Sequence, residues 1–99
     1  MVTVHKYELE EVPGSNVILM PRSAQVLSAQ WHPAKGGISL WALLDDEEKE
    51  KRTRLFIVAN TGGTYLEKYG SGDLFFIGTC QESQGTIVWH VFERLGPDR

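Results

Sequence analysis

The sequence predicts a mainly β fold: a small antiparallel β-sheet or sandwich built from hairpins, with at most one short helix and a single domain over residues 1–99. Three observations support this prediction. Short segments either alternate apolar and polar residues or are continuously apolar, as strands do. Turn-forming glycine and proline residues separate these segments. A tryptophan-centred pattern, typical of the second strand of a hairpin, occurs twice.

The first half of the chain reads as strands and turns in regular succession. The first segment alternates well, and Pro13 and Gly14 follow it as a turn. Pro21 closes the second segment, as expected at a sheet edge or a strand exit. The loop 32–37 then has the length of a hairpin connection. The strands expected over the whole chain are 2–9, 17–20, 24–31, 38–44, 54–61, 74–80 and 86–93.

The second half contains two long connections. Nine of the ten residues in 45–54 are charged, which indicates a solvated segment, either a long hairpin loop or a mobile excursion, rather than a helix. Four glycines in 62–73 indicate a long connection with room for one helical turn near 65–69. The strands expected at 38–44, 54–61 and 86–93 are apolar on both faces, so something must cover the second face. A second layer of the same chain or another copy of it could do so.

The repeated pattern begins as GGISLWALLDD at Gly36 and as QGTIVWHVFER at Gln84. The matched positions are Gly37 and Gly85, Trp41 and Trp89, and Asp45 and Glu93. We interpret both copies as the second strand of a hairpin, the two hairpins spanning 25–45 and 74–93. The glycine ends the turn, the tryptophan packs inward or against a partner, and the acid marks the exit to solvent.

Composition excludes several classes of protein. The formal net charge of −3 argues against general DNA coating, which needs clustered positive charge. A lone cysteine, Cys80, cannot form an internal disulfide and fits a reducing compartment. No apolar segment approaches the roughly 20 residues that span a bilayer, and the N-terminus lacks a signal-peptide pattern. We therefore expect a cytoplasmic protein without a membrane or DNA partner.

The sequence also lacks the spacing of a metal site or a catalytic nucleophile. One cysteine and three histidines show no paired spacing that would hold zinc. The acidic run 45–48 could hold a divalent cation, but a charged loop tip is the simpler interpretation. His90 is expected to be a hydrogen-bonded histidine of the core or of an interface. We expect no enzyme activity, no catalytic residue, no metal and no cofactor.

A binding site for a phosphorylated aromatic ligand is the sharper hypothesis. Tryptophans in strands can stack on a base, paired glycines after a strand can expose N–H groups to an anion, and arginines can bind phosphate. The glycines belong to the loop 60–64, and a turn is its simpler interpretation. The expected ligand-binding residues are Arg22, Trp41, Arg54, Asn60, Thr61, Gly62, Gly63, Trp89 and His90.

Several stretches spread over almost the whole chain match one known family: KYEL, MPRSAQVLSAQ from Met20, ISLWALLD from Ile38, RLFIV from Arg54, and FIGTC followed by TIVWHVFE. Through them the chain resembles small bacteriophage and prophage proteins of about 100 residues that carry a domain of unknown function. The most specific signatures are LWALxD and VWHVFE. Members often carry Gly-Thr-Gly-His after the fifth strand, where this chain has Asn-Thr-Gly-Gly, so a role of that histidine does not transfer.

The resemblance implies a viral accessory protein in the host bacterial cytoplasm. We expect a non-enzymatic inhibitor of a bacterial defence system that sequesters a nucleotide-derived signalling molecule. The alternatives are a protein–protein inhibitor of a host defence protein, using a strand edge or the acidic run, and a structural or assembly component of the virion. The surplus of apolar surface also predicts a homo-oligomer, a dimer or higher, with Trp89 or Val91 in or beside its interface.

Overall fold

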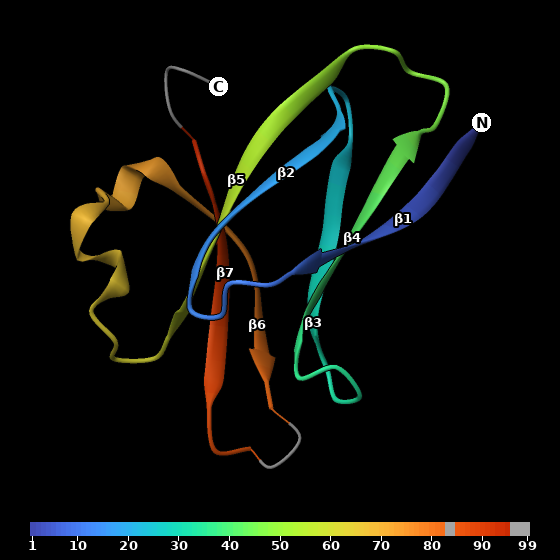
Figure 1. Ribbon diagram of the computed structural model, residues 1–99. Coiled ribbons are helices and arrows are strands. Elements are labelled where there is room, and N and C mark those ends of the chain that lie inside the picture. The colour runs from blue at the N-terminus through green and yellow to red at the C-terminus, as the bar shows by residue number, and fades with distance from the viewer. Residues whose placement is uncertain (83–84, 96–99) are drawn as a thin grey trace.

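The computed structural model describes residues 1–82 and 85–95, and these residues form seven strands and two short 3-10 turns without an α-helix (Figure 1). The predicted mainly β class is confirmed. The elements are β1 (Val2–Leu9), β2 (Gly14–Pro21), β3 (Gln25–His32), β4 (Gly37–Asp45), β5 (Lys51–Asn60), η1 (Tyr65–Lys68), η2 (Ser71–Asp73), β6 (Leu74–Gln81) and β7 (Val88–Arg94).

Two antiparallel sheets pack face to face. One sheet has the order β1-β4-β3 and the other β2-β5-β7-β6. Both predicted hairpins are present, β3–β4 in the first sheet and β6–β7 in the second. The remaining pairs, β1–β4, β2–β5 and β5–β7, join strands that are not consecutive. The chain therefore crosses between the sheets after β1, β2 and β4, whereas the connection from β5 to β6 stays in one sheet and passes over β7.

The charged segment after β4 is a crossover, so the predicted hairpin loop is wrong. β4 and β5 lie in different sheets and do not pair. β5 also begins at Lys51, three residues before the expected strand, because Lys51, Arg52 and Thr53 pair with the end of β2. Charged residues can begin this strand because the side chains of Lys51 and Arg52 are exposed at the end of the sandwich.

The strands that are apolar on both faces are covered within the chain. Buried side chains of both sheets form the core between them, including Leu40 on β4, Phe56 and Val58 on β5, and Val91 on β7. Ile57 points to the opposite face of β5 and is also fully buried. The connection after β5 covers this face, because Ser15, the register partner of Ile57, is bonded by the hydroxyls of two tyrosines from that connection.

Trp89 and Val91 belong to this internal core, with 7% and 0% of their surfaces exposed. Because the chain itself covers their apolar surface, neither side chain can contribute a large surface to an interface between copies. A position of these residues beside such an interface, and self-association itself, stay predictions.

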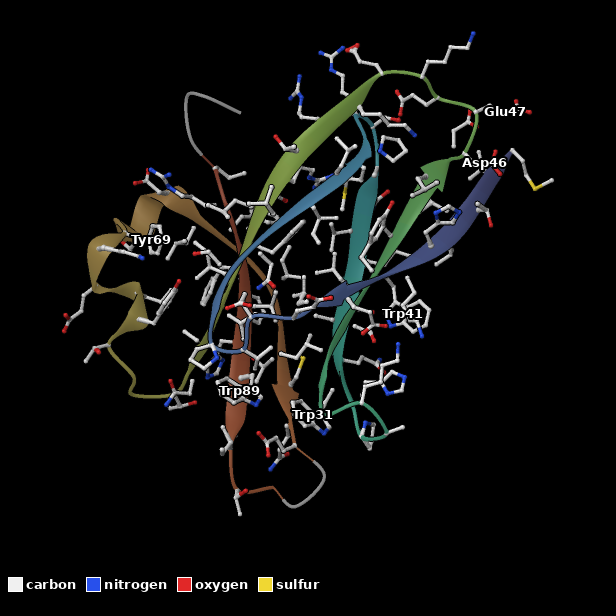
Figure 2. All side chains as sticks on the ribbon, in the orientation of Figure 1. Trp31, Trp41, Asp46, Glu47, Tyr69 and Trp89 are labelled. Carbon is white, nitrogen blue, oxygen red and sulfur yellow. The ribbon has the colours of Figure 1, made fainter. Side chains whose placement is uncertain are left out.

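The two copies of the repeated pattern have opposite orientations, which corrects the idea of one shared role. Trp89 points into the core, whereas Trp41 lies half-buried on the outer face of its sheet (Figure 2). Asp45 does mark the exit of β4. Glu93 is only 5% exposed and faces the interior, so it does not mark an exit to solvent.

The edges of the sandwich differ. β6 packs beside β3, where a Cβ added at Gly78 would lie 3.7 Å from the backbone of Ala29, an ordinary van der Waals contact. On the opposite side, β1 and β2 each pair along one edge only. Their other edges have no strand partner among the described residues.

Candidate functional site

The nine residues expected to bind a ligand fall into three separate places. Asn60, Thr61 and Trp89 line one hollow at the end of the sandwich where β5 stops and β7 begins. Arg22 and Arg54 line a second hollow that contains none of the first group. Trp41 lies on the outer face of the β1-β4-β3 sheet, away from both. The remaining three of the nine, Gly62, Gly63 and His90, lie in the chain next to residues of the first hollow.

The first hollow, which we call the Trp89 hollow, has a volume of about 390 Å³. This falls within the usual size of small-molecule sites, roughly 300–1,000 Å³. Its wall combines polar side chains with apolar ones, and the described lining residues carry no charge. The lining residues are Pro13, Asn60, Thr61, Thr86, Ile87, Val88 and Trp89.

Trp89 is held in place by both sequence-distant and local contacts. It is the register partner of Asn60 on β5 and of Cys80 on β6. Its indole N–H donates a hydrogen bond of 3.0 Å to the Glu82 carboxylate. A buried tryptophan normally needs such a partner for its N–H. The ring is therefore a fixed wall of the hollow rather than a mobile stacking platform.

A tight turn shapes the polar side of the Trp89 hollow. The N–H of Gly63 donates to the carbonyl of Asn60 at 3.1 Å, and Gly62 has φ +75°. A positive φ at the third turn position is the geometry of a type II turn and favours glycine. A Cβ at Gly63 would collide with the Asn60 side chain. The turn expected from Asn-Thr-Gly-Gly is confirmed, and the backbone N–H groups of Gly62 and Thr64 have no hydrogen-bond partner among the described residues.

His90 lies on the outer face of its sheet between two threonine hydroxyls, so it is hydrogen-bonded as expected but does not belong to the core, and an interface role stays a prediction. Its Nε2 is 2.6 Å from the hydroxyl of Thr61, and its Nδ1 is 3.1 Å from that of Thr79. In either neutral tautomer one ring nitrogen donates and the other accepts, and a hydroxyl can serve both. His90 thus fixes the Thr61 side chain, which also lines the Trp89 hollow.

Arg54 is an internal structural group rather than a free anion ligand. Its Nε and Nη2 donate to the two carboxylate oxygens of Glu93 at 2.7 and 2.8 Å. Its Nη1 donates to the carbonyl of Ala24 at 2.6 Å. The side chains of Arg54 and Glu93 are only 14% and 6% exposed. This bidentate pair links β5 and β7 to the crossover between β2 and β3.

The second hollow, about 310 Å³, contains the other arginines, and we call it the arginine hollow. Arg22 makes an exposed ion pair of 3.1 Å with Glu50. Arg52 lines the hollow without an ion pair to the described residues. Arg54 is engaged by Glu93 and Ala24, and neither Arg22 nor Arg52 lines the Trp89 hollow. The ligand site expected from the sequence is therefore split between two hollows.

Trp41 lies beside Lys6 on the outer face, with the ammonium nitrogen 5.8 Å from the ring centroid. Lys6 is its register partner on β1, which explains the contact. This cation–π contact at a partly exposed position contributes about 0.5–1 kcal/mol. The Trp41 ring does not line either of the two hollows.

The acidic run 45–48 binds the chain's own amino terminus. The Met1 amino group lies 3.0 Å from carboxylate oxygens of both Asp45 and Asp46. A hydrogen bond from the Glu47 backbone, and then one from the Met1 amino group, lower the pKa of Asp45. Figure 2 shows Asp46 and Glu47 together beside the start of β1. Across residues 1–82 and 85–95, no group of acidic, histidine and cysteine side chains could hold a metal ion.

Sequence reasoning missed the apolar wall of the Trp89 hollow. Pro13 belongs to the β1–β2 turn and Ile87 precedes β7, so the two are far apart in the chain. The sequence did contain a signal for Ile87, because a large apolar residue next to a turn is a candidate for a binding surface. The structure leaves its side chain 39% exposed. Pro13 carried only the signal of a turn, and the cis peptide bond before it was not expected.

In the part of the chain that the structure describes, no helix is long and apolar enough to cross a membrane. No curated protein and no solved structure shows significant similarity to the chain. One family model does match, and it covers residues 1–98. Over almost its whole length, this two-sheet protein with an uncharged hollow at one end belongs to the family described as Domain of unknown function (DUF7352).

Proposed function

We propose that the protein is a non-enzymatic binding protein that captures a small nucleotide-derived molecule in the Trp89 hollow. One observation carries the proposal: the fold brings Asn60 and Thr61, which begin the turn after β5, and Trp89 on β7 together in one hollow of about 390 Å³. These were separate candidates in the sequence. Their meeting supports a ligand site more strongly than either feature alone.

The walls of the hollow match the parts of a nucleoside. Ile87 and Pro13 offer apolar surface on which a base or ribose can pack, next to the Trp89 ring. Asn60 and Thr61 offer an amide and a hydroxyl, which can both donate to and accept from a base edge. The N–H groups of Gly62 and Thr64 belong to the same turn but lie beside the wall of the hollow rather than in it, and such donors suit a phosphate oxygen.

The charge of the hollow restricts the ligand further. The described lining residues include no arginine or lysine, and the arginines lie in the other hollow. A triphosphate would lack cationic partners here. We therefore favour a molecule with few charges, such as a nucleoside monophosphate or a phosphodiester, over a nucleoside triphosphate.

The biological role follows from the resemblance of the sequence to bacteriophage and prophage proteins. In this proposal the protein acts in the cytoplasm of the host bacterium and withholds a signalling nucleotide from a defence system. The LWALxD and VWHVFE stretches support this origin. VWHVFE also supplies Trp89 to the hollow and His90 to the outer face, so part of that signature belongs to the proposed site.

The test begins with capture and release. Purified protein is incubated with bacterial extract, re-isolated and denatured, and released compounds are identified by mass spectrometry. We expect a nucleotide-derived compound in a stoichiometric amount, recovered chemically intact. In parallel, calorimetry with a panel of linear and cyclic nucleotides measures affinity directly.

Matched variants locate the binding. Thr61→Val and Ile87→Asp alter the Trp89 hollow, whereas Thr53→Val and Leu27→Asp make the same changes at exposed positions elsewhere. We expect the first two to weaken affinity about tenfold or more, the size of one lost hydrogen bond or apolar contact, and the other two to bind as the wild type does. Turnover of a nucleotide, or no binding from extract and panel, would overturn the proposal. A co-purifying host protein instead would favour the alternative of protein–protein inhibition.

A further inference from the structure

The free edge of β2 has few of the features that normally prevent strand pairing, and the one present is a proline, Pro21, at its last residue. β2 spans eight residues, GSNVILMP, and none of them is charged. Its pairing with β5 runs over eight consecutive positions without a bulge. Val17 and Leu19 are 67% and 60% exposed on its outer face. Proteins usually protect such an edge with charges, bulges or a covering segment, because it can add another strand.

The other free edge, that of β1, shows the usual protection. Lys6 and Glu8 lie on β1, and their side chains form an ion pair of 3.6 Å. Charged side chains on an edge strand must be desolvated when a partner strand arrives, and this disfavours pairing. The edges of β1 and β2 therefore differ, and in the described residues that of β2 carries less protection against strand addition.

The two ends of β2 carry opposite charges. Before its start, the exposed residues Glu10 and Glu11 line a hollow beside the first half of the strand. At its end, Lys51 and Arg52 are the register partners of Pro21 and Met20. None of these four side chains forms an ion pair with the described residues. The end of β2 also carries Arg22, which pairs with Glu50, and Ser23, which bonds Glu48, so its cations outnumber its carboxylates by only three to two. Lys51 and Arg52 belong to β5, one strand behind the free edge. The strand is thus neutral along its length, acidic at its start and weakly basic at its end.

We propose that this edge pairs with the same edge of a second copy, antiparallel about a two-fold axis. This arrangement places the acidic start of each β2 beside the basic end of its partner, so both pairs of ends are complementary. Val17 and Leu19 of the two copies become cross-strand neighbours on one face and lose water contact. The two four-stranded sheets join into one continuous sheet, and the two uncharged edges are removed together.

A single substitution with a matched control tests the edge. Val17→Lys places a charge on β2 at an exposed position, where the fold of the free chain tolerates it. Val4→Lys makes the same change at an exposed position of β1. Sedimentation equilibrium at micromolar concentrations should show the wild type and Val4→Lys at twice the 11.2 kDa chain mass. Val17→Lys should weaken the dimer about tenfold or more, because like charges then face each other.

A charge exchange tests the antiparallel register. In variant A, Glu10 and Glu11 become lysine; in variant B, Lys51 and Arg52 become glutamate. Each variant has like charges at both ends of β2 and should not dimerise with itself, whereas a mixture of A and B should form the heterodimer. Circular dichroism confirms that both variants are folded.

Three results would overturn the proposal. The first is a wild-type protein that sediments as an 11.2 kDa monomer over the whole concentration range. The second is a dimer that Val17→Lys leaves intact. The third is an A–B mixture that associates no better than A or B alone. The proposal does not depend on the Trp89 hollow, so a dimer without nucleotide binding would leave it standing.

Discussion

Replacing one member of the Arg54–Glu93 pair should destabilise the protein more than any change at its surface. The guanidinium bonds both oxygens of the Glu93 carboxylate at 2.7 and 2.8 Å and the Ala24 carbonyl at 2.6 Å. With 14% and 6% of their side chains exposed, both groups are largely shielded from water. Arg54→Met leaves the carboxylate without this partner, and Glu93→Leu leaves the guanidinium without its counter-ion.

The magnitude follows from the cost of a buried charge without its partner. Removing one member of a buried, hydrogen-bonded pair costs about 3–5 kcal/mol. A domain of this size is stable by about 5–15 kcal/mol, so either single variant should lose a large fraction of its stability. The double variant Arg54→Met with Glu93→Leu replaces both charges by apolar groups and should be within about 1–2 kcal/mol of the wild type. The coupling between the two positions is therefore several kcal/mol.

The wild type, the two single variants and the double variant form a double-mutant cycle. Urea denaturation followed by tryptophan fluorescence measures the free energy of unfolding of all four proteins, because Trp89 is buried in the folded chain. The control is Arg22→Met, which breaks an exposed pair whose side chains are 54% and 58% exposed. That change should cost no more than about 1 kcal/mol. If Arg54→Met and Glu93→Leu each cost as little as the control, the pair is not acting as a buried one and the reasoning fails.

Three further predictions concern the core. Val91→Asp places a carboxylate at a position with no exposure, so it should unfold the chain rather than only dissociate a dimer. A variant whose circular dichroism is that of the folded wild type would contradict the internal core. Trp89→Ala should cost about 3–5 kcal/mol in urea denaturation, whereas Trp41→Ala, on the outer face, should cost about 1 kcal/mol, and equal costs would contradict their different burial. Burial raises the pKa of the Cys80 thiol above its ordinary value of about 9.0, so its contribution to stability is present below that pH and is lost as pH rises through the folded pKa. Native protein should therefore react with a thiol reagent far more slowly than denatured protein, and Cys80→Ala should reduce the loss of stability at alkaline pH; equal reactivity in the two states would show that the thiol is accessible.

The sequence by itself determined the local elements of this protein. Alternation and apolar runs identified the strands, because the two-residue period is a property of each strand alone. Glycine and proline located the turns of both hairpins, and Gly62 satisfies a positive φ that other residues adopt at a cost. Pairing within a hairpin followed, because its strands are neighbours in the chain.

Only the tertiary structure decided which faces are buried and which distant residues meet. Trp41 and Trp89 occupy equivalent places in two hairpins, yet one faces outward and the other inward, because β4 turns Leu40 and Ala42 toward the core whereas β7 turns Trp89 and Val91 toward it. Glu93 has the sequence position of an acid at a strand exit, and only the fold places it beside Arg54, 39 positions earlier. The pairing of β5 with β7 brings Trp89 to Asn60 and Thr61, and the arginines lie in a separate hollow. Local periodicity carries no information on the order of strands across two sheets, and that order determines which side chains share a site.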